Sequence, residues 1–445
     1  MSPNDGLAGA QRGWAFAAIA IATFIAVLDG AIANIALPPI TREFGIEPVD
    51  AIWIVNAYQL AVTMVLLPLA SLGEAVGYRR VYLGGVAAFT IASLLCALSQ
   101  SLPVLILARA LQGLGAAGIM SVNIALVRFI FPQAMLGRAL GYVAMIVGVS
   151  SAAGPSIAGV LLAFSPWQTL FLINVPIGCL ALLTGWRTLP HTPPSGHRFD
   201  LRSAFLSAAT FGLVISGING LGHAEGMVLA FGQIGLGILV GIVFVRSQLA
   251  RPAPMLPVDL LRKPVFALSA ATSICSFSAA AIAFVCLPFF LHDTLGRSPS
   301  QTGLLMTPWP VATAIAAVIS GRLADRFPPG KLSAVGLALF ASGLLALVFL
   351  PQVPSDLDMI WRLVLAGFGF GIFQTPNNKL LISSAPRERS GGASGIQSTA
   401  RLVGQSGGVA LLAIVFGLVP HGEIQVALIL ATLLAAGGIV PSALR

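Results

Sequence analysis

The sequence predicts an all-α protein that crosses a membrane fourteen times, as two six-helix bundles plus two additional helices. Of the 445 residues, 57% are hydrophobic and only 9% are charged, whereas a soluble domain carries about 25% charged residues. Apolar runs of membrane-spanning length follow one another along the chain, and a short loop sequence recurs in both halves. Helices are the expected structure because every backbone polar group inside lipid must be satisfied internally.

Fourteen apolar runs set the positions of the predicted elements. Each has about 18–27 residues, enough to cross a hydrocarbon core of ~30 Å at about 1.5 Å per residue. The connections between them are short, so we expect no attached soluble domain. The first run is too long for a signal peptide, and we expect it to be retained. The predicted spans are residues 14–38, 51–73, 81–99, 103–127, 139–163, 168–187, 203–221, 227–245, 265–291, 302–321, 332–350, 360–383, 394–417 and 424–442.

The two longest connections divide the chain. They lie near residues 188–202 and 246–264, and both are rich in Pro and Arg. We therefore expect an N-terminal six-helix bundle, a linker that contains the two additional helices, and a C-terminal six-helix bundle. We assign no chemistry to the additional helices and expect them to face the bilayer at the edge of the bundle. The predicted divisions are residues 14–187, 188–264 and 265–445.

The distribution of cations predicts the orientation in the membrane. With the N-terminus in the cytoplasm, only Arg42, Arg297 and Arg362 of the 24 Lys and Arg residues fall outside. Arg109 lies within a span, and the other 20, Arg401 among them, belong to cytoplasmic connections and adjoining span ends. The positive-inside rule thus predicts a multi-pass protein of the cell (inner) membrane with both termini in the cytoplasm. The net charge of +9 follows from these topology signals and does not indicate nucleic-acid binding.

The sequence offers no metal-binding motif and no catalytic cluster. The pattern CxxC, the pattern HExxH and clustered histidines are all missing,. The five histidines lie in loops or near span ends, with no nucleophile beside them. We therefore expect no metal ion, no cofactor and no enzymatic activity. Four cysteines lie within spans, where we expect them to act as small packing residues: Cys96, Cys179, Cys275 and Cys286.

A loop motif appears once in each half of the chain. ASLGEAVGYRR at 70–80 and SGRLADRFPPGK at 320–331 both place an acid before a turn and then cations. Two like halves related by an axis along the membrane normal would produce this repeat, although short loops of Gly, acid and Arg also arise by chance. The acid and the cations can pair to close the inner face. The candidate gating residues are Glu74, Gly77, Arg79, Arg80, Gly321, Asp325 and Arg326.

Asp29 lies inside the first span, in VLDGAIANIALP at 27–38. A carboxylate at the centre of a membrane helix costs about 2.5–3.5 kcal/mol. On a helical wheel it shares a face with five alanines, and such stripes of small residues face other helices or a cavity. We therefore expect the carboxylate to point into the protein.

The expected partner of Asp29 is Arg109, the cation left within the bilayer. Arg109 shares a face with Gln112, Gly113 and Asn123 in LARALQGLGAAGIMSVN at 107–123. The two charges could meet directly or through water. Such a pair can take up and release a proton between an outward and an inward state. The alternative is a fixed internal ion pair that only orients helices.

The fifth span carries a face of small residues, in GYVAMIVGVSSAAGPSIAG at 141–159. Gly141, Gly148, Ala152, Pro155 and Gly159 fall on this face. A small-residue groove with a Pro kink is a surface on which two helices can rock. Plain close packing is the alternative.

Over nearly its whole length, the chain resembles the major facilitator superfamily and, within it, the fourteen-helix drug:proton antiporter family. LDGAIANIALP resembles the first-helix motif of that family, with Asp29 at its acidic position. LGEAVGYRR resembles the loop motif after the second helix, although Glu74 replaces the usual Asp and Ala75 replaces a usual Arg. Arg109 and Gln112 match the fourth-helix motif tied to proton coupling. The fifth-helix motif, which marks exporters, is matched by Gly141, Gly154, Pro155 and Gly159.

The resemblance implies a major facilitator fold and proton-coupled efflux, or drug:H⁺ antiport, by alternating access. A cavity between the bundles would open inward and outward in turn, and proton binding at Asp29 would favour one state. The implied partners are a small-molecule substrate, protons and the lipid bilayer, without a cofactor or nucleic acid, and the implied state is a monomer. Asp29 is the one acid embedded in a span, so we expect hydrophobic substrates that are neutral or monocationic.

Two alternatives stay open on the same scaffold: a dedicated exporter of one metabolite, and an importer. A membrane enzyme or a receptor would need a catalytic cluster or a soluble module, and the sequence shows neither. Polar residues within the spans line the substrate cavity or form hydrogen bonds between helices. These candidates are Asn34, Asn56, Tyr58, Gln59, Gln112, Asn123, Gln374 and Asn377.

Overall fold

The computed structural model describes residues 6–132, 135–193, 199–221, 226–249, 258–324, 326–351, 354–384, 390–419 and 422–445. All regular secondary structure within these ranges is helical. Thirteen of the described helical segments are long and apolar enough to cross a membrane. A further long helix at residues 356–383 covers the remaining predicted span. The prediction of an all-α polytopic membrane protein is therefore confirmed.

The N-terminal bundle comprises six spans, the last of which is broken into two helices. Its helices are α1 (Gly9–Phe44), α2 (Pro48–Val76), α3 (Tyr78–Leu98), α4 (Leu102–Ile130), α5 (Leu136–Phe164), α6 (Gln168–Leu172) and α7 (Asn174–Thr188). The linker contributes α8 (Leu201–Gly220), α9 (Met227–Leu249) and the 3-10 helix η3 (Val258–Arg262).

The C-terminal bundle repeats this plan with more breaks. Its helices are α10 (Pro264–Phe289), η4 (Phe290–Thr294), α11 (Pro299–Met306), α12 (Pro308–Leu323), α13 (Pro329–Val348), α14 (Asp356–Ser383), α15 (Ser390–Leu418), α16 (Glu423–Gly437) and α17 (Ile439–Ala443).

Prolines set many of these boundaries. Five helices begin at a proline, which is favoured in the first turn because it needs no amide hydrogen bond there,. The spans predicted at 168–187 and 302–321 as continuous helices are each broken. Pro176 lacks the amide that would bond to the Leu172 carbonyl, and Pro308 lacks the one for Leu304,. The first break makes Asn174 the first residue of α7.

Glycines let neighbouring helices approach closely at equivalent places in both bundles. A Cβ on Gly115 of α4 would lie 2.7 Å from the Cα of Phe89 in α3. In the second bundle, a Cβ on Gly369 of α14 would lie 2.7 Å from the Cα of Phe340 in α13. Close backbone packing of this kind replaces the hydrophobic driving force that helices lack in lipid.

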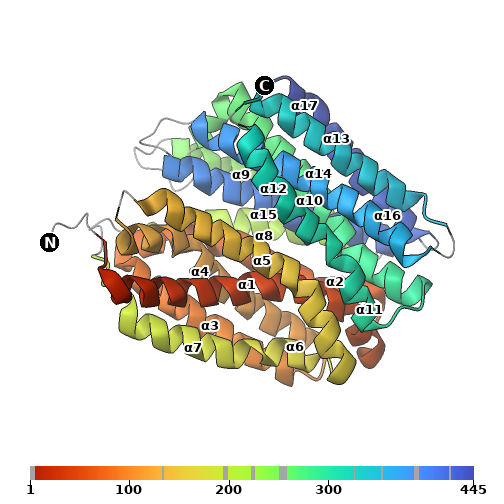
Figure 1. Ribbon diagram of the computed structural model, residues 1–445, viewed down its shortest axis with the longest axis horizontal. Helices are drawn as coiled ribbons and strands as arrows, with labels where there is room; N and C mark the ends of the chain where they lie inside the picture. Colours follow the sequence, from red (N-terminus) through yellow and green to blue (C-terminus); the bar gives the residue numbers. More distant parts are fainter. Residues whose placement is uncertain are drawn as a thin grey trace.

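The two bundles share a large hydrophobic core at one end, and nearer the middle a hydrogen bond between Thr63 and Ser406 joins α2 to α15. We call the end where α1 begins the proximal end and the end where it finishes the distal end. At the distal end one hydrophobic core joins both bundles, with Ile35 and Trp167 of the first and Phe289 and Met306 of the second among its members. In Figure 1 the two bundles converge at this end, where α5 and α11 meet.

At the proximal end the hydrophobic core is divided. One cluster belongs to the N-terminal bundle, with Leu402 its single buried member from the C-terminal bundle. A separate small cluster around Phe266 and Leu381 belongs to the C-terminal bundle. The described residues therefore form an arrangement that is closed at the distal end and parted at the proximal end.

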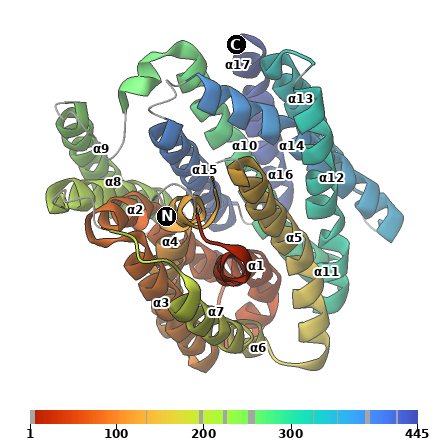
Figure 2. The same cartoon turned by 60° about the vertical axis from the view of Figure 1, so that its left-hand side comes forward.

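The two additional helices have different surroundings. In Figure 2 α8 lies beside α2, and α9 stands outside it. Ile215 of α8 packs with Leu60 of α2 and Ala410 of α15, so α8 contacts both bundles. α9 packs mainly on α8, and Val228 in it is 89% exposed. The expectation that the additional helices face the bilayer therefore fits α9. α8, in contrast, lies between α9 and the two bundles.

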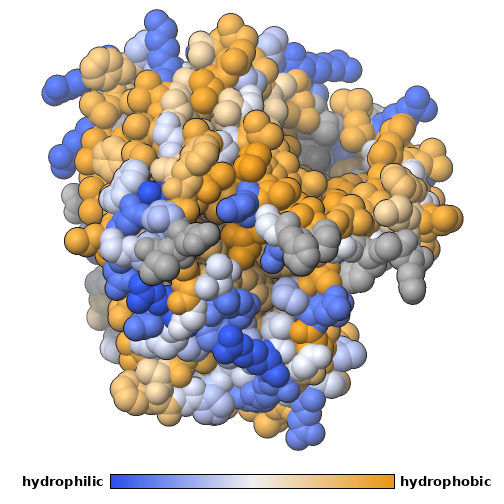
Figure 3. All heavy atoms as spheres, turned by 90° about the vertical axis from the view of Figure 1, so that its right-hand side faces the viewer, coloured by the Kyte–Doolittle hydropathy of each residue, from blue (hydrophilic) through white to orange (hydrophobic). Residues whose placement is uncertain are grey.

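The surface matches a protein surrounded by lipid. Figure 3 looks onto the distal end, where hydrophilic residues gather in the lower half of the view and hydrophobic residues cover much of the rest. Arg42 and Glu43 at the end of α1 are exposed there, as is Glu47 before α2. Large apolar side chains are exposed along the outer helices, where lipid tails would cover them.

Candidate functional site

Asp29 and Arg109 form an ion pair in the centre of the N-terminal bundle. The Arg109 Nη1 lies 2.5 Å from the Asp29 Oδ2, and both residues are 0% exposed. α1 places the acid and α4 places the base, each on the polar side of its helix. The pair is direct, without room for an intervening water.

Three further side chains complete the network around Asp29. The Asp29 Oδ1 accepts hydrogen bonds from Gln112 Nε2 and from Asn174 Nδ2, each at 2.8 Å. Gln112 also accepts from Arg109 at 2.5 Å and donates to the Ser93 hydroxyl at 2.8 Å. The carboxylate therefore receives three charge-assisted hydrogen bonds, which are the strong kind. Helices α1, α3, α4 and α7 meet at this one group.

The guanidinium of Arg109 is held on its other sides by α2 and α6. Its Nε donates to the Ile54 carbonyl at 3.1 Å. Its charged carbon lies 4.4 Å from the centre of the Tyr58 ring and 5.5 Å from that of Phe171, within the range of cation–π attraction. The Tyr58 hydroxyl donates to the Ala26 carbonyl at 3.1 Å. The pair is thus enclosed and dry, so losing either charge would leave the other buried without a partner.

The small residues of α5 make close contacts between the bundles. A Cβ on Gly159 would lie 2.8 Å from the Ser300 carbonyl oxygen, and one on Gly303 would lie 2.8 Å from the Gly159 Cα. Beside them, Ser156 and Thr307 share a hydrogen bond of 2.6 Å. The predicted groove of small residues is therefore the surface on which α11 packs at the distal end.

The same helix also contacts the Asp29 helix. Gly154 of α5 packs directly on the Cβ of Ala31, two residues beyond Asp29. Pro155 presents its carbonyl to Gly303 of α11. Gly141 lies near the proximal start of α5. Different faces of α5 thus contact α1 and the C-terminal bundle.

The first predicted gating loop is tied to its own bundle. The Arg79 side chain bonds to the Trp186 carbonyl and to His191, at 2.7 Å from its Nε2. Gly77 has a φ of +99°, and a Cβ there would lie 2.7 Å from the Thr192 carbonyl oxygen. Among the described residues, Glu74 and Arg80 make no ion pair with the C-terminal bundle, and Arg80 donates to its own helix at the Val76 carbonyl.

The second predicted gating loop follows α12. Gly321 lies near the end of α12, beside Thr375 of α14, and Arg326 is exposed. Asp325 lies outside the described residues. A pairing of cations and acids that closes the proximal end stays a prediction for both loops.

Six of the eight candidate cavity residues are buried inside a bundle. Tyr58 and Gln112 belong to the Asp29 network. Asn123 donates to Thr23 at 2.8 Å and Asn377 donates to Ser273 at 2.7 Å, so both join helices within their own bundles.

The remaining four candidates differ in exposure. Asn34 bonds to the Gly30 carbonyl of its own helix, and Asn56 is buried with neither amide atom bonded. Gln59 and Gln374 are half-buried, without a hydrogen bond to a described residue. Gln59 and Gln374 are therefore the two members whose exposure fits the wall of a cavity.

Comparisons with known proteins identify the family. The family model described as Major Facilitator Superfamily matches residues 19–409. The chain belongs to the major facilitator superfamily. It is 50% identical to the uncharacterized transporter YebQ of Escherichia coli, over 99% of this chain and 97% of that protein. It is 30% identical to the riboflavin transporter RibZ of Clostridioides difficile, over 86% and 83% of the two chains.

Other relatives are efflux proteins, and solved structures share the fold. The multidrug efflux pump LfrA of Mycolicibacterium smegmatis is 32% identical, over 91% of this chain and 81% of that protein. A bacterial homolog of the human lysosomal transporter Spinster, solved inward-facing and unoccupied, superposes with a TM-score of 0.69 at 15% identity over 98% of both chains. A peptide transporter solved with sulfate gives 0.73 at 15% identity, over 96% and 93%.

In the structure of this major facilitator protein, Arg401 lies within the candidate span at residues 395–418 of α15 and is half-buried. Its assignment to the cytoplasmic side of the membrane stays a prediction. Within the described residues this arginine makes no ion pair and no hydrogen bond. Arg401 lies within electrostatic range of Tyr58 on α2 of the other bundle, and therefore close to the boundary between the bundles.

Sequence reasoning also missed Asn174 and Ser93, which complete the Asp29 network. Asn174 lies in the stretch LINVPIG, where an amide precedes a proline inside an apolar span. An amide before a proline inside an apolar span could have indicated a functional position. A proline break exposes polar backbone and favours a polar side chain beside it. Ser93 is a single small hydroxyl in α3, and nothing in the sequence distinguishes it from other serines within spans.

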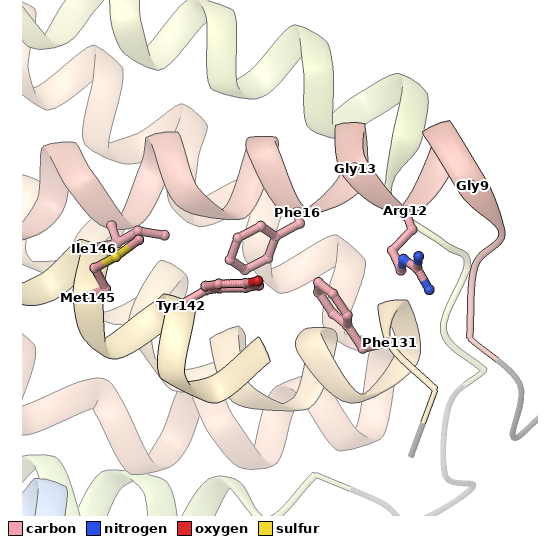
Figure 4. Close-up of a pocket in the computed structure, with 8 residues that line it drawn as sticks. All are labelled: Gly9, Arg12, Gly13, Phe16, Phe131, Tyr142, Met145 and Ile146. Carbon is pink, nitrogen blue, oxygen red and sulfur yellow. The ribbon is translucent and has the colours of Figure 1, made fainter. Parts of the chain in front are cut away.

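A separate pocket lies on the flank of the N-terminal bundle near the proximal end (Figure 4). It has a volume of about 410 Å³ and lies between α1, α5 and the end of α4. Phe16 and Phe131 stack edge to face at 5.3 Å, and the Arg12 guanidinium lies 5.9 Å from the Phe131 ring. Met145 and Tyr142 in its wall are exposed large side chains. The pocket opens to the flank, and none of the Asp29 network lines it.

Proposed function

We propose that this major facilitator protein exports hydrophobic small molecules across the cell membrane in exchange for protons, by alternating access. The observation that carries the proposal is the sealed ion pair of Asp29 and Arg109 in the N-terminal bundle. A buried charge inside a membrane helix is expensive and marks function by default. The efflux proteins among the relatives support export as the direction.

The proposed coupling begins with a proton on Asp29. A protonated carboxyl loses its negative charge and much of its capacity to accept, so its bonds from Arg109, Gln112 and Asn174 weaken. α1 is then free to move relative to α4 and α7. Ala31 of α1 packs on Gly154 of α5, and α5 packs on α11, which gives a contiguous route from the acid to the distal contact between bundles.

The proposed topology places the proximal end in the cytoplasm, following the distribution of cations. The parted proximal end would then be the inward-open state, ready to take substrate from the cytoplasm or the inner leaflet. The transporter would work as a monomer without a bound cofactor, driven by the proton gradient. The sequence-based expectation for the substrate is a neutral or monocationic hydrophobic compound, and membership of the fourteen-helix antiporter family is part of this proposal.

A dedicated metabolite transporter is the second candidate. The resemblance to a riboflavin transporter favours it, because a relative of similar identity is named for a single compound. A panel of transported compounds separates the two: a drug exporter accepts many hydrophobic scaffolds, whereas a dedicated transporter accepts one and its close analogues.

The test uses inverted membrane vesicles with an acidic interior. Substrate transport into wild-type vesicles is expected to release protons, measured by a pH-sensitive dye on addition of ethidium, of neutral hydrophobic dyes and of anionic ones. Asp29→Asn is expected to abolish this release. Glu47→Gln, which removes an exposed acid of the distal end, is the matched control and is expected to behave as wild type.

The Asp29→Asn variant leaves Arg109 buried without a counter-charge, which costs about 3–5 kcal/mol. The double variant Asp29→Asn with Arg109→Gln removes both charges and guards against a folding defect. If Asp29→Asn and wild type release protons alike, the pair is a fixed structural ion pair. If no compound of the panel moves protons in wild type, proton-coupled export of hydrophobic compounds is the wrong function.

A further inference from the structure

Arg401 is a cation inside a membrane-spanning helix that the Asp29 mechanism does not use. It is half-buried in α15, and no described residue bonds to it. A charge in this position is costly unless it pairs or faces water. Lys379 on α14 is different, because it donates to the Ala324 carbonyl at 3.0 Å.

The neighbours of α15 define which way Arg401 faces. Gly404 and Gly408 pack on α10, since a Cβ on either would lie within 2.7 Å of an α10 carbonyl oxygen. Ser406 bonds to Thr63 of α2 at 3.0 Å. At about 100° per residue, Arg401 and Gln405 lie between these two faces. Because α10 and α2 belong to different bundles, that side of α15 faces the space between the bundles.

The described residues provide no acid to neutralise Arg401. Asp29 is the one described carboxylate inside a span away from its ends, and both of its oxygens are taken by its own network. The Tyr58 hydroxyl on α2 lies within electrostatic range of Arg401, but it donates its hydrogen bond to the Ala26 carbonyl. Among the described residues, the positive charge of Arg401 on this side of α15 is therefore not compensated by an acid.

Three amides without a partner among the described residues lie on helices that border the same space. Gln405 is half-buried on the same side of α15, and Gln59 is half-buried on α2. Gln374 of α14 lies between Gly371, which packs on α12, and Asn377, which bonds to α10, so it too faces the space. None of the three has a hydrogen bond to a described residue. A guanidinium with flanking amides offers several N–H donors and suits an oxyanion.

We propose that Arg401 binds an anionic group on the substrate, so that the transported compounds are hydrophobic organic anions, such as aromatic carboxylates. This inference rests on the proposed function, that the protein moves small hydrophobic molecules through this space. It replaces the sequence-based expectation of neutral or monocationic substrates, because Arg401 repels monocations and favours compounds with one acidic group. The guanidinium can hold a carboxylate through two parallel N–H bonds.

The test is a binding measurement on the full chain in lipid nanodiscs, without a proton gradient. The probes share one aromatic ring system and differ in charge: 2-naphthoate, its methyl ester and 2-naphthylmethylammonium. Wild type is expected to bind naphthoate most tightly. Arg401→Gln is expected to weaken naphthoate binding roughly tenfold to a hundredfold, the range for a charge-assisted hydrogen bond, and to leave the ester unchanged. Arg401→Lys is expected to keep part of the preference.

The matched control is Arg246→Gln, which removes an exposed cation near the end of α9 and should not alter any affinity. The proposal is overturned if wild type does not bind naphthoate, if it binds the ester or the ammonium as tightly, or if Arg401→Gln keeps the preference. If Arg401→Gln does not fold, Gln405→Ala provides a second test of the anion site. The binding test uses no gradient, so a preference for naphthoate that depends on Arg401 supports the anion site even if the vesicle experiment shows no proton release. Conversely, proton release without a preference for naphthoate refutes the anion site and leaves the proposed function intact.

Discussion

Replacing Gly303 with alanine should open the distal end. With the bundles closed there, a Cβ on Gly303 would lie 2.8 Å from the Gly159 Cα and closer still to the Pro155 carbonyl oxygen. Carbon atoms prefer about 3.5–4.0 Å, so α5 and α11 must separate by about 0.7 Å or more. The adjacent hydrogen bond between Ser156 and Thr307, 2.6 Å long, is stretched by the same movement.

The size of the effect follows from these two contacts. Overpacking of a tight interface costs about 1–3 kcal/mol, and a lost hydrogen bond costs about 0.5–1.5 kcal/mol. Together about 2–4 kcal/mol disfavours the closed distal end, which shifts the ratio of distal-open to distal-closed molecules roughly 30- to 700-fold. Because Gly→Ala also favours a helix by up to about 1 kcal/mol, Gly407→Ala is the control, with no neighbour within 4 Å.

Distances between spin labels on the two bundles measure this shift. Labels at Glu43 and Asp356, both exposed near the distal end, report the separation in a background without the four native cysteines. Gly303→Ala should populate a longer distance that wild type and Gly407→Ala lack. If all three proteins give the same distribution, the contact between α5 and α11 does not limit distal closure, and the argument from these glycines is wrong.

Three further variants test the described contacts by thermal unfolding of the purified protein. Asn174→Ala removes one donor to Asp29 and should lower stability by about 1–3 kcal/mol; an unchanged melting temperature would mean that this bond is not formed. Asn56→Leu should be neutral or stabilising, since neither of its buried amide atoms is bonded,, and a large loss would reveal a missing partner. Arg42→Gln should change stability by less than about 1 kcal/mol, because its 3.2 Å pair with Asp293 is exposed,; a larger loss that persists in high salt would show that the distal closure depends on this pair.

The pairing of Asp29 with Arg109 could be predicted from the sequence because a charge buried in a membrane is costly unless it pairs with an opposite charge. An acid in the first span and a base in the fourth, each on a face with small residues, were expected to pair inside the protein. The contribution of Asn174 could not be predicted in the same way. Its position depends on the break at Ile173, and a continuous helix from 168 to 187 would have placed its amide elsewhere.

The side on which Arg401 lies was beyond sequence reasoning. A long side chain near the start of a span can reach the interface, so the residue resembled the other topology signals. A helical wheel gives only relative directions until the neighbours of the helix are known. The packing of Gly404 on α10 and of Ser406 on α2 is tertiary information, and it places Arg401 between the bundles.

Because α8 contacts both bundles, the bilayer should influence how fast this protein changes between its states. α8 touches α2 on one bundle and α15 on the other, while α9 stands outside it among lipid tails. When the bundles rock, α8 must slide along at least one of these helices, and α9 must displace lipid as it follows. Membrane viscosity should therefore alter the speed of exchange between states more than their relative populations, and turnover should slow in stiffer bilayers.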